Sequence, residues 1–577
     1  MTVIPRPKKM IEKAGYTDCT EFEFFGDREV LNIFPYKSTP NATAFNFIKD
    51  TNLACEEYKI DTDGAVTVRY STLEGAYRAL ATFEQIRAQS TDGKIANMTV
   101  HDRPKIKRRA FMLDISRGRL PKTSTLKKLI DLMAMLKYNE LQLYVDAPVY
   151  AYPNFCGYTN KASLTPDDIK EIQDCCKKHF IRLVPNQNSF GHMGAWLKKD
   201  AFSHLAIHGG DGKPTNTLNP LNDGCCEFLR KLYGGYADIF DADTMHIGMD
   251  EPFDLGTGET EEICKEKGVG TVYTDYLNKV CRIAKDEYGK VPMFWSDIVF
   301  KHEENLKDIP RYAVVMEWGY ENEHRFDKNA QKLHSLGLDF YLCPGTSCHN
   351  SFTGRSDNMI FNISAAVKAA QSFGARGVML TEWGDFGHPQ FPVFTAFPLA
   401  FAAALSWSGL SGDEDTAYDE RREVIENCKS FLDRFIFSSK GEFSFADALL
   451  KAGNYYLLEN SLHTNKTLLY GRTVKKDFAL TASERSSFES VYEYIKKVKS
   501  ELILSDADTK CTEQALVNID MVVLFCEYLL KGASPKLGAA FKDLKERFVT
   551  LWCGDNFNDG HEIFCAMIDD YINFNRE

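Results

Sequence analysis

The chain has 577 residues, of which 44% are apolar, 12% aromatic and 26% charged, a composition typical of globular proteins. A single hydrophobic core does not grow to this length, so we expect two or three domains. The formal net charge of −12 comes from acids and bases mixed along the chain, which argues against a protein that binds nucleic acid.

The first residues, MTVIPRPKKMIEKAGY, are basic and lack the apolar segment of a secretory signal. The most apolar stretch, FTAFPLAFAAALSW at 394–407, is too short to cross a membrane, and we expect it to be a core helix. Most of the 16 cysteines lie within apolar patterns and are interpreted as free thiols of a reducing compartment. These features predict a cytoplasmic protein without a membrane partner.

Residues 1–103 are predicted to form a small α+β domain. Within 55–89, two short β-rich runs flank a turn and are followed by a helical pattern. The turn, DTDG at 61–64, resembles the start of a calcium loop but lacks the later ligands, so we interpret it as a hairpin turn.

From residue 104 to about 410, short β-rich runs alternate with longer amphipathic segments. The amphipathic segments include 124–138 and 166–180. The expected strands are 108–116, 138–146, 181–189, 243–251, 292–300, 312–319, 338–346 and 377–385. Because eight β-then-α units build a parallel sheet that closes on itself, we predict a (β/α)8 TIM barrel of the α/β class.

After residue 411 the strand pattern stops, and 411–577 is predicted to be a helical C-terminal domain. Helical patterns cover 447–462, 486–502 and 513–532. A homodimer formed through these helices and closure of the active site by them remain alternatives, because neither has a signature in the sequence.

Polar side chains gather at the C-terminal ends of the predicted barrel strands, the edge at which such barrels place their active sites. These residues are Arg117, Asp146, Asn188, Asp250, Glu251, Asp297, Glu317 and Asp385. Adjacent acids within a strand would point to opposite faces. At a strand end the backbone can turn, so Asp250 and Glu251 need not diverge.

Three of the six tryptophans, Trp295, Trp318 and Trp383, also end predicted strands. Carboxylates and an arginine bind sugar hydroxyls, and tryptophan rings stack on the apolar face of a sugar. We therefore expect a carbohydrate ligand at this edge of the barrel.

The segment HIGMDE, 246–251, resembles the H-x-G-G-D-E signature of glycoside hydrolase family 20, the β-N-acetylhexosaminidases, with Met249 in place of a glycine. Other segments resemble the family in the same order. They are RRAFMLDISRG at 108–118, the helix and second strand ending at Asp146, IRLVPNQNSFGHMGAW at 181–196 and EWGD at 382–385. The resemblance covers about residues 50–405 and implies hydrolysis of terminal β-linked N-acetylhexosamines without a metal or cofactor.

The resemblance implies a substrate-assisted mechanism, an exception to the usual pair of protein carboxylates in retaining glycosidases. Glu251 would be the general acid and base, and Asp250 would orient the 2-acetamido group that attacks the anomeric carbon. Around them, Trp295 and Trp318 would enclose the acetamido methyl and Trp383 would lie under the ring. Arg117 and Asp385 would hold hydroxyls, and His192 and Asp146 would pair near the acid.

The sequence departs from the family at the tyrosine that follows strand seven and binds the acetamido oxygen. Tyr341 lies too early, within the strand, while His349 and Asn350 stand nearer the expected place. Tyr320, after strand six, is an alternative from another direction. Asparagines occupy positions 186 and 188 where acids are usual, and His388 is expected at the mouth of the pocket.

Three hypotheses follow from these residues. The first is an exo-acting β-N-acetylhexosaminidase. The second is a barrel β-glycosidase of different sugar specificity, which the missing tyrosine permits. The third is a non-catalytic glycan-binding protein, although loss of the acid pair would be its usual mark. The choice between N-acetylglucosamine and N-acetylgalactosamine depends on loops and is left open.

Overall fold

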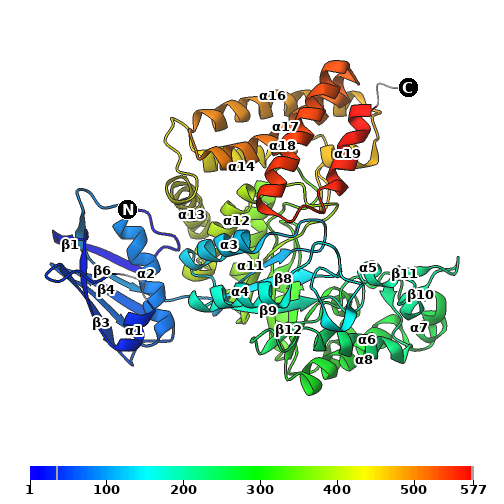
Figure 1. Cartoon of the computed structure of the whole chain (residues 1–577), viewed down its shortest axis with the longest axis horizontal. Coiled ribbons are helices and arrows are strands. Elements are labelled where there is room, and N and C mark those ends of the chain that lie inside the picture. The colour runs from blue at the N-terminus through cyan, green and yellow to red at the C-terminus, as the bar shows by residue number, and fades with distance from the viewer. Residues whose placement is uncertain (34–36, 574–577) are drawn as a thin grey trace.

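The computed structural model describes residues 1–33 and 37–573, which form three consecutive parts of the chain (Figure 1). An N-terminal sheet with its helix lies to one side of a central barrel, and a group of C-terminal helices covers another side of that barrel. The closed barrel confirms the predicted α/β TIM-barrel class.

The N-terminal part is a six-stranded sheet of order β1-β6-β4-β5-β3-β2, packed against α2. Its elements are β1 (Lys9–Asp18), β2 (Phe22–Phe25), α1 (Arg28–Asn32), β3 (Thr43–Lys49), β4 (Tyr58–Thr62), β5 (Val66–Tyr70), α2 (Leu73–Arg87) and β6 (Lys94–Asp102). The predicted hairpin is the antiparallel pair β4–β5, and its turn residue Gly64 has a φ of 69°. Buried and partly exposed residues alternate along both strands, as expected for a sheet with one covered face.

Eight parallel strands close the barrel. They are β7 (Arg108–Asp114), β8 (Glu140–Val145), β9 (Arg182–Gln187), β12 (Thr244–His246), β13 (Val291–Trp295), β14 (Val314–Trp318), β15 (Asp339–Cys343) and β16 (Gly377–Glu382). The intervening helices include α3 (Thr123–Met135), α4 (Pro166–Lys178), α6 (Asp223–Gly234), α7 (Glu261–Lys267), α8 (Val269–Arg282), α9 (Asp297–Lys301), α10 (Phe326–Ser335), α11 (Ser356–Phe373) and α12 (Ala396–Ser408). A short helix α5 (Gly194–Leu197) and the hairpin β10 (Ala206–His208) and β11 (Pro214–Leu218) follow β9.

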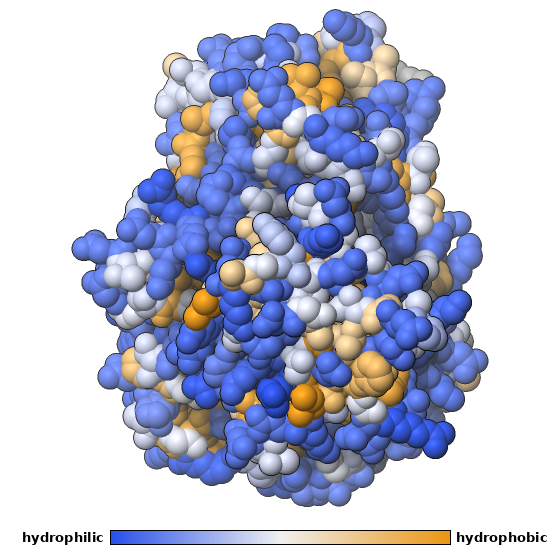
Figure 2. All heavy atoms as spheres, turned by 90° about the vertical axis from the view of Figure 1, so that its left-hand side faces the viewer, coloured by the Kyte–Doolittle hydropathy of each residue, from blue (hydrophilic) through white to orange (hydrophobic). Residues whose placement is uncertain are grey.

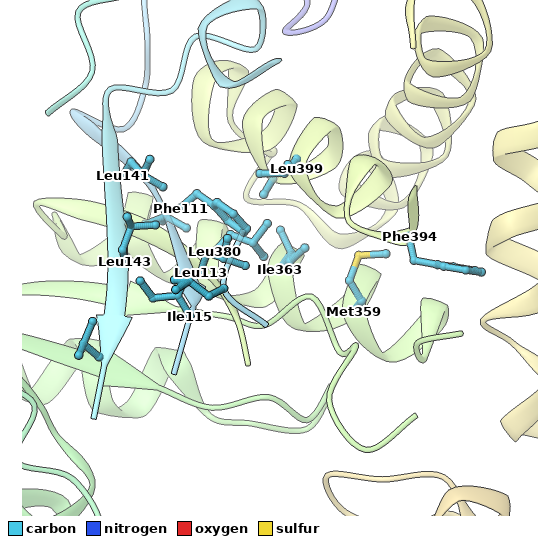
Figure 3. Close-up of a cluster of buried hydrophobic side chains, with 14 of the residues drawn as sticks. Phe111, Leu113, Ile115, Leu141, Leu143, Met359, Ile363, Leu380, Phe394 and Leu399 are labelled. Atoms are coloured by element: carbon cyan, nitrogen blue, oxygen red, sulfur yellow. The ribbon is translucent and has the colours of Figure 1, made fainter. Parts of the chain in front are cut away.

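Alternation along the strands builds two separate cores. On β7, Ala110 and Met112 point into the barrel, whereas Phe111 and Leu113 belong to the layer between the strands and the outer helices. Figure 3 shows this outer layer, in which Phe111, Leu113 and Leu380 face Ile363 of α11 and Leu399 of α12. The apolar stretch 394–407 is accordingly a core helix, buried along nearly all of α12.

The C-terminal part consists of α13 (Glu414–Phe435), α14 (Phe445–Ala452), α15 (Leu468–Lys475), α16 (Ala482–Leu504), α17 (Thr509–Lys531), α18 (Pro535–Asp555) and α19 (Glu562–Asn573). The helical pattern at 447–462 is confirmed in part, because α14 ends at Ala452 and a 3-10 helix follows at Tyr455–Leu458. A Cβ atom at Gly453 would lie 2.2 Å from Ser356 Oγ, so this contact with the barrel leaves no room for a side chain at position 453.

The C-terminal helices share one continuous hydrophobic core with the barrel. Asn518 of α17 accepts a hydrogen bond from the Phe391 backbone (2.9 Å) and donates one to the Pro389 carbonyl (3.1 Å). The N-terminal part is joined to the barrel by a buried ion pair, Lys137 Nζ to Asp102 Oδ2, at 2.9 Å. All three parts are therefore fixed by buried contacts.

The face shown in Figure 2 is mostly hydrophilic, with apolar atoms in small scattered patches. No helix within 1–33 or 37–573 is both long enough and apolar enough to span a membrane. All 16 cysteines are free thiols.

Candidate active site

A cavity of about 190 Å³ opens at the C-terminal ends of the barrel strands, where the polar residues were expected. Nine of the ten predicted site residues line it, and Asp146 is the exception. The lining residues are Arg117, His192, Asp250, Glu251, Trp295, Trp318, Tyr320, His349, Asn350, Trp383, Asp385 and Asn465.

The backbone after β12 explains how neighbouring acids come to face the same cavity. The strand ends at His246, earlier than predicted, and φ is positive at Gly248 (69°), Met249 (80°) and Glu251 (45°). These left-handed residues break the alternation of a strand. As a result His192 Nε2 lies 3.4 Å from Asp250 Oδ2 and 3.1 Å from Glu251 Oε2.

Close packing holds this strained loop in place. A Cβ atom at Gly248 would lie 2.5 Å from Asn188 Oδ1, so only glycine fits there. The same Asn188 oxygen accepts the Met249 N–H at 3.3 Å, and the Tyr273 hydroxyl donates to the Met249 carbonyl at 3.0 Å. The neighbouring elements thus determine a conformation that the loop would not adopt alone.

The surroundings keep Asp250 ionised. Burial favours its neutral form, but the charges of His192 and Arg117 and a hydrogen bond from Asn188 Nδ2 (2.7 Å) lower its pKa below the usual value. Burial would likewise lower the pKa of His192, but the Asp250 carboxylate raises it to about 10. At neutral pH the two form an ion pair beside Glu251.

A third acid, Asp297, lies next to the pair at the start of α9, just after β13. Its Oδ2 accepts the backbone N–H of Glu251 at 3.2 Å, while Oδ1 has no hydrogen-bond partner within the described part of the chain. Burial, followed by the charge of Asp250, raises the pKa of Asp297 to about 7. This acid therefore titrates near neutral pH within hydrogen-bond reach of the loop that carries Asp250 and Glu251.

Four aromatic side chains form the walls of the cavity. The rings of Trp318 and Tyr320 stack with centroids 5.0 Å apart, and those of Trp295 and Trp383 are 5.8 Å apart. Trp383 Nε1 donates to the Tyr320 hydroxyl at 2.7 Å. The Tyr320 hydroxyl also forms a side-chain hydrogen bond with Thr381.

Arg117 is held by acids on three sides. It donates from NH1 to Asp114 Oδ2 (2.8 Å), lies 3.2 Å from Asp146 Oδ2 and 3.9 Å from Asp385 Oδ1. Asp146 thus contacts Arg117 rather than His192, and the expected pairing of Asp146 with His192 is wrong. The reason is that His192 turns toward the acid pair instead.

The structure also locates the candidates to replace the family tyrosine that this sequence lacks. Tyr341 is buried inside the barrel, where its hydroxyl lies 3.2 Å from Glu140 Oε2, so it is excluded as the replacement. His349, Asn350 and Tyr320 all reach the cavity. The expectation for His388 is wrong: it is 3% exposed and does not line the cavity, because it packs against Arg119 and Glu382.

Asn465 was not predicted, and it comes from the C-terminal part of the chain. It lies between α14 and α15, has a φ of 59°, and donates its backbone N–H to Glu321 at 2.7 Å. Glu321 forms a two-pronged ion pair with Arg355 (2.9 Å), and Asn350 donates to the Asn465 carbonyl at 3.2 Å. No periodicity or motif in the sequence connects this loop with the barrel.

Side chains that could bind a metal ion lie close together outside this cavity. In residues 1–33 and 37–573, two groups of three His, Cys, Asp or Glu side chains lie close enough to share one ion, and neither contains Asp250 or Glu251.

Comparison with known families supports the sequence resemblance. Residues 107–362 match the family model described as the catalytic domain of glycosyl hydrolase family 20. The human β-hexosaminidase subunit β is 28% identical over 244 residues, which cover 39% of this chain and 44% of that protein. The chain spans about half the length of the curated relatives it matches, 49% for that of Felis catus.

Solved structures share the fold. A chitobiase from Flavobacterium johnsoniae is 18% identical with a TM-score of 0.60, and the match covers 98% of this chain and 99% of that one. An exo β-N-acetylglucosaminidase from Vibrio harveyi, solved with N-acetylglucosamine, is 16% identical with a TM-score of 0.57, covering 74% of this chain and 78% of that one.

Proposed function

The barrel of this chain belongs to glycoside hydrolase family 20, and from that premise we propose that the protein is an exo-acting β-N-acetylhexosaminidase. It removes terminal β-linked N-acetylglucosamine or N-acetylgalactosamine from glycans or glycoconjugates and retains the anomeric configuration. The observation that carries the proposal is the adjacent pair Asp250 and Glu251, turned toward one cavity walled by aromatic rings.

The size of the cavity favours release of single sugars. At about 190 Å³ it has room for one sugar ring. Together with the names of its relatives, this supports cleavage at a chain end.

In the first step Glu251 gives its proton to the glycosidic oxygen while the substrate's acetamido oxygen attacks the anomeric carbon. The bond to the leaving group breaks and a cyclic oxazolinium forms. Asp250 accepts the acetamide N–H and balances the developing positive charge. Its lowered pKa supports this role, because an ionised carboxylate carries no proton on either oxygen and can accept a further hydrogen bond beside that from Asn188.

In the second step water attacks the anomeric carbon from the face vacated by the leaving group. Glu251, now a carboxylate, takes a proton from that water, and the acetamido oxygen leaves the anomeric carbon. Two inversions at one centre give net retention. No further acid or base is required.

The remaining lining residues position the sugar. Trp295 and Trp318 enclose the acetamido methyl, and Trp383 supports the ring. Arg117 and Asp385 bind ring hydroxyls, and Asp146 acts by holding Arg117.

We assign the missing tyrosine's task to Tyr320. Tyr320 lines the cavity, and its hydroxyl, which accepts a hydrogen bond from Trp383, would donate its proton to the acetamido oxygen in place of Thr381.

The test is the release of nitrophenol from the β-N-acetylglucosaminide, the β-N-acetylgalactosaminide and the β-glucoside. We expect rapid release from the first two only. Glu251→Gln and Asp250→Asn should each lower kcat/KM by about 10²–10⁴-fold, the range for a positioned acid or base. Glu262→Gln, an exposed acid on α7, is the matched control and should change nothing.

Two results would overturn the proposal. Equal rates on the glucoside would remove the acetamido group from the mechanism and leave a β-glycosidase of other specificity. A folded protein that releases no sugar but binds N-acetylglucosamine would be a glycan-binding protein.

A further inference from the structure

A second cluster of chemically competent side chains lies outside the barrel mouth. Asp131 of α3, Cys175 of α4 and His179, which follows the last turn of α4, place their donor atoms within 4.8 Å of one another. Cys175 and His179 are four residues apart and therefore share one face of the helix. The three residues combine a thiol, an imidazole and a carboxylate.

The spacing of these donors suits one metal ion. Two ligand atoms held about 2.1 Å from an ion at a tetrahedral angle are about 3.4 Å apart. His179 Nε2 and Asp131 Oδ1 are 3.0 Å apart. The side chain of Asp131 is 64% exposed, so it can adjust to an ion without disturbing the core.

The imidazole is already oriented by its neighbours. Its Nδ1 is hydrogen-bonded to the hydroxyl of Tyr77 from α2, which turns Nε2 toward Asp131. Arg78 holds the adjacent backbone through the carbonyls of His179 (3.4 Å) and Phe180 (3.1 Å). A hydrogen bond to the second ring nitrogen is the usual support of a histidine that binds metal.

The cluster is open to solvent on two sides. Tyr77, Asp131 and His179 line a cleft of about 820 Å³ between the N-terminal sheet domain and the barrel helices. Asp131 and Cys175 also line a groove of about 530 Å³ on the other side. An ion can therefore enter, and water can complete its coordination.

We propose that Asp131, Cys175 and His179 bind one thiophilic divalent cation, of which Zn²⁺ fits best. A sulfur and an imidazole nitrogen select zinc over magnesium or calcium, which prefer oxygen ligands alone. The ion ties α3 to α4 at the point where α2 of the N-terminal domain meets the barrel. Its role is structural, because the catalytic cavity has its own, separate lining.

The other group of possible metal ligands in the described residues is less suited to bind a cation. Cys348, Glu382 and His388 are also close together, but all three are buried. Arg119 NH1 lies 3.3 Å from His388 Nε2, so a fixed positive charge already occupies the position a cation would need.

The Cys175-Cys176 pair does not match the spacing of a zinc-binding motif in the sequence, because only one of the two cysteines belongs to the proposed site. Cys176 is fully buried in the core, and only Cys175 faces the donors. The ligands come from two helices and from one member of a Cys-Cys pair, a pattern outside the usual zinc motifs.

The test is binding of Zn²⁺ to the full-length protein without an affinity tag, measured by calorimetry after treatment with a chelator. We expect one equivalent, and a thiolate-to-metal absorption band when Co²⁺ replaces Zn²⁺. Cys175→Ser and His179→Gln should each weaken binding at least tenfold. Tyr77→Phe should weaken it by about 10–100-fold, the range for a lost hydrogen bond behind a ligand.

Controls separate this site from adventitious binding. Cys156→Ser removes an exposed thiol outside the cluster and should leave affinity unchanged. Asp131→Asn, at an exposed position, serves if Cys175→Ser fails to fold. Zn²⁺ should also raise Tm of the parent protein and not of Cys175→Ser. Absence of binding, or binding that survives both Cys175→Ser and Asp131→Asn, would overturn the proposal.

Discussion

Asn188→Asp probes the electrostatics beneath the acid pair. Asn188 is buried, and its Nδ2 donates to Asp250 Oδ1 at 2.7 Å. The substitution puts a carboxylate oxygen at that distance from an ionised one. At 2.7 Å and an effective dielectric constant of about 20, two such charges repel by about 6 kcal/mol.

This repulsion raises the pKa of the new carboxyl. Burial adds to the rise, and the backbone N–H groups of Ser189 (2.8 Å) and Met249 (3.3 Å), which bond to Oδ1, offset part of it. We expect a pKa of roughly 7, about three units above that of an ordinary aspartate. While protonated, the new carboxyl donates to Asp250 as the amide does, so the variant should resemble the parent.

The stability of the variant therefore depends on pH. Because the pKa is raised in the folded state, folding is unaffected below about pH 4, where both states are protonated. Between about pH 4 and 7 the variant should lose about 1.4 kcal/mol of stability per pH unit relative to the parent, and about 4 kcal/mol in all. The measurement is Tm of variant and parent from pH 4 to 9, with kcat/KM over the same range.

The control is to make Asn188→Asp in a protein that already carries Asp250→Asn. Without the Asp250 charge, most of the pH dependence caused by Asn188→Asp should disappear. A loss of Tm that is the same at pH 4 and pH 8, or equally steep in both backgrounds, would refute the assignment of the effect to the Asp250 charge.

Three further outcomes are expected. Asp297→Asn should raise Tm above pH 7 and leave it unchanged below pH 4. The raised pKa of Asp297 means that the parent protein loses stability as pH rises from about 4 to 7, and the variant does not. An equal shift of Tm above pH 7 and below pH 4 would contradict this. Lys137→Met should destabilise by about 3–5 kcal/mol in urea unfolding, since it leaves the buried Asp102 unpaired, whereas Lys127→Met at an exposed pair should cost under about 1 kcal/mol. Asn465→Gly keeps the left-handed backbone and removes only the side chain that lines the cavity, so KM should rise while Tm stays nearly constant; an unchanged KM would show that the side chain does not touch substrate.

Much of the barrel was predictable because its strands are short, almost fully buried and separated by amphipathic helices. In a parallel barrel the C-terminal ends of all strands meet at one edge. Arg117, Asp250 and Trp383 follow strand ends, so they could be placed together from the sequence. The N-terminal sheet was harder to predict. Its edge strand β1 is largely exposed, so it lacks the alternation that marked β4 and β5.

Features of the site that depend on tertiary contacts were not predictable. The left-handed turn at Met249 exists because Asn188 and Tyr273 hold it. The orientation of His192 also depends on tertiary contacts, because its ring lies against Asp250 and Glu251 and not against Asp146. Asn465 reaches the cavity from a loop more than two hundred residues beyond the acid pair, and only the packing of the helices reveals it.

The position of Asn465 limits how this protein can be shortened. A fragment ending near residue 411 would retain every strand of the barrel and both acids. It would nevertheless lose Asn465 from the lining of the cavity, one hydrogen-bond donor to Glu321 and the partner of Phe391, and it would expose the apolar side of the barrel that α17 now covers. The C-terminal helices are thus part of the same folded unit as the barrel, and a fragment cut at the end of the barrel would not keep the cavity intact.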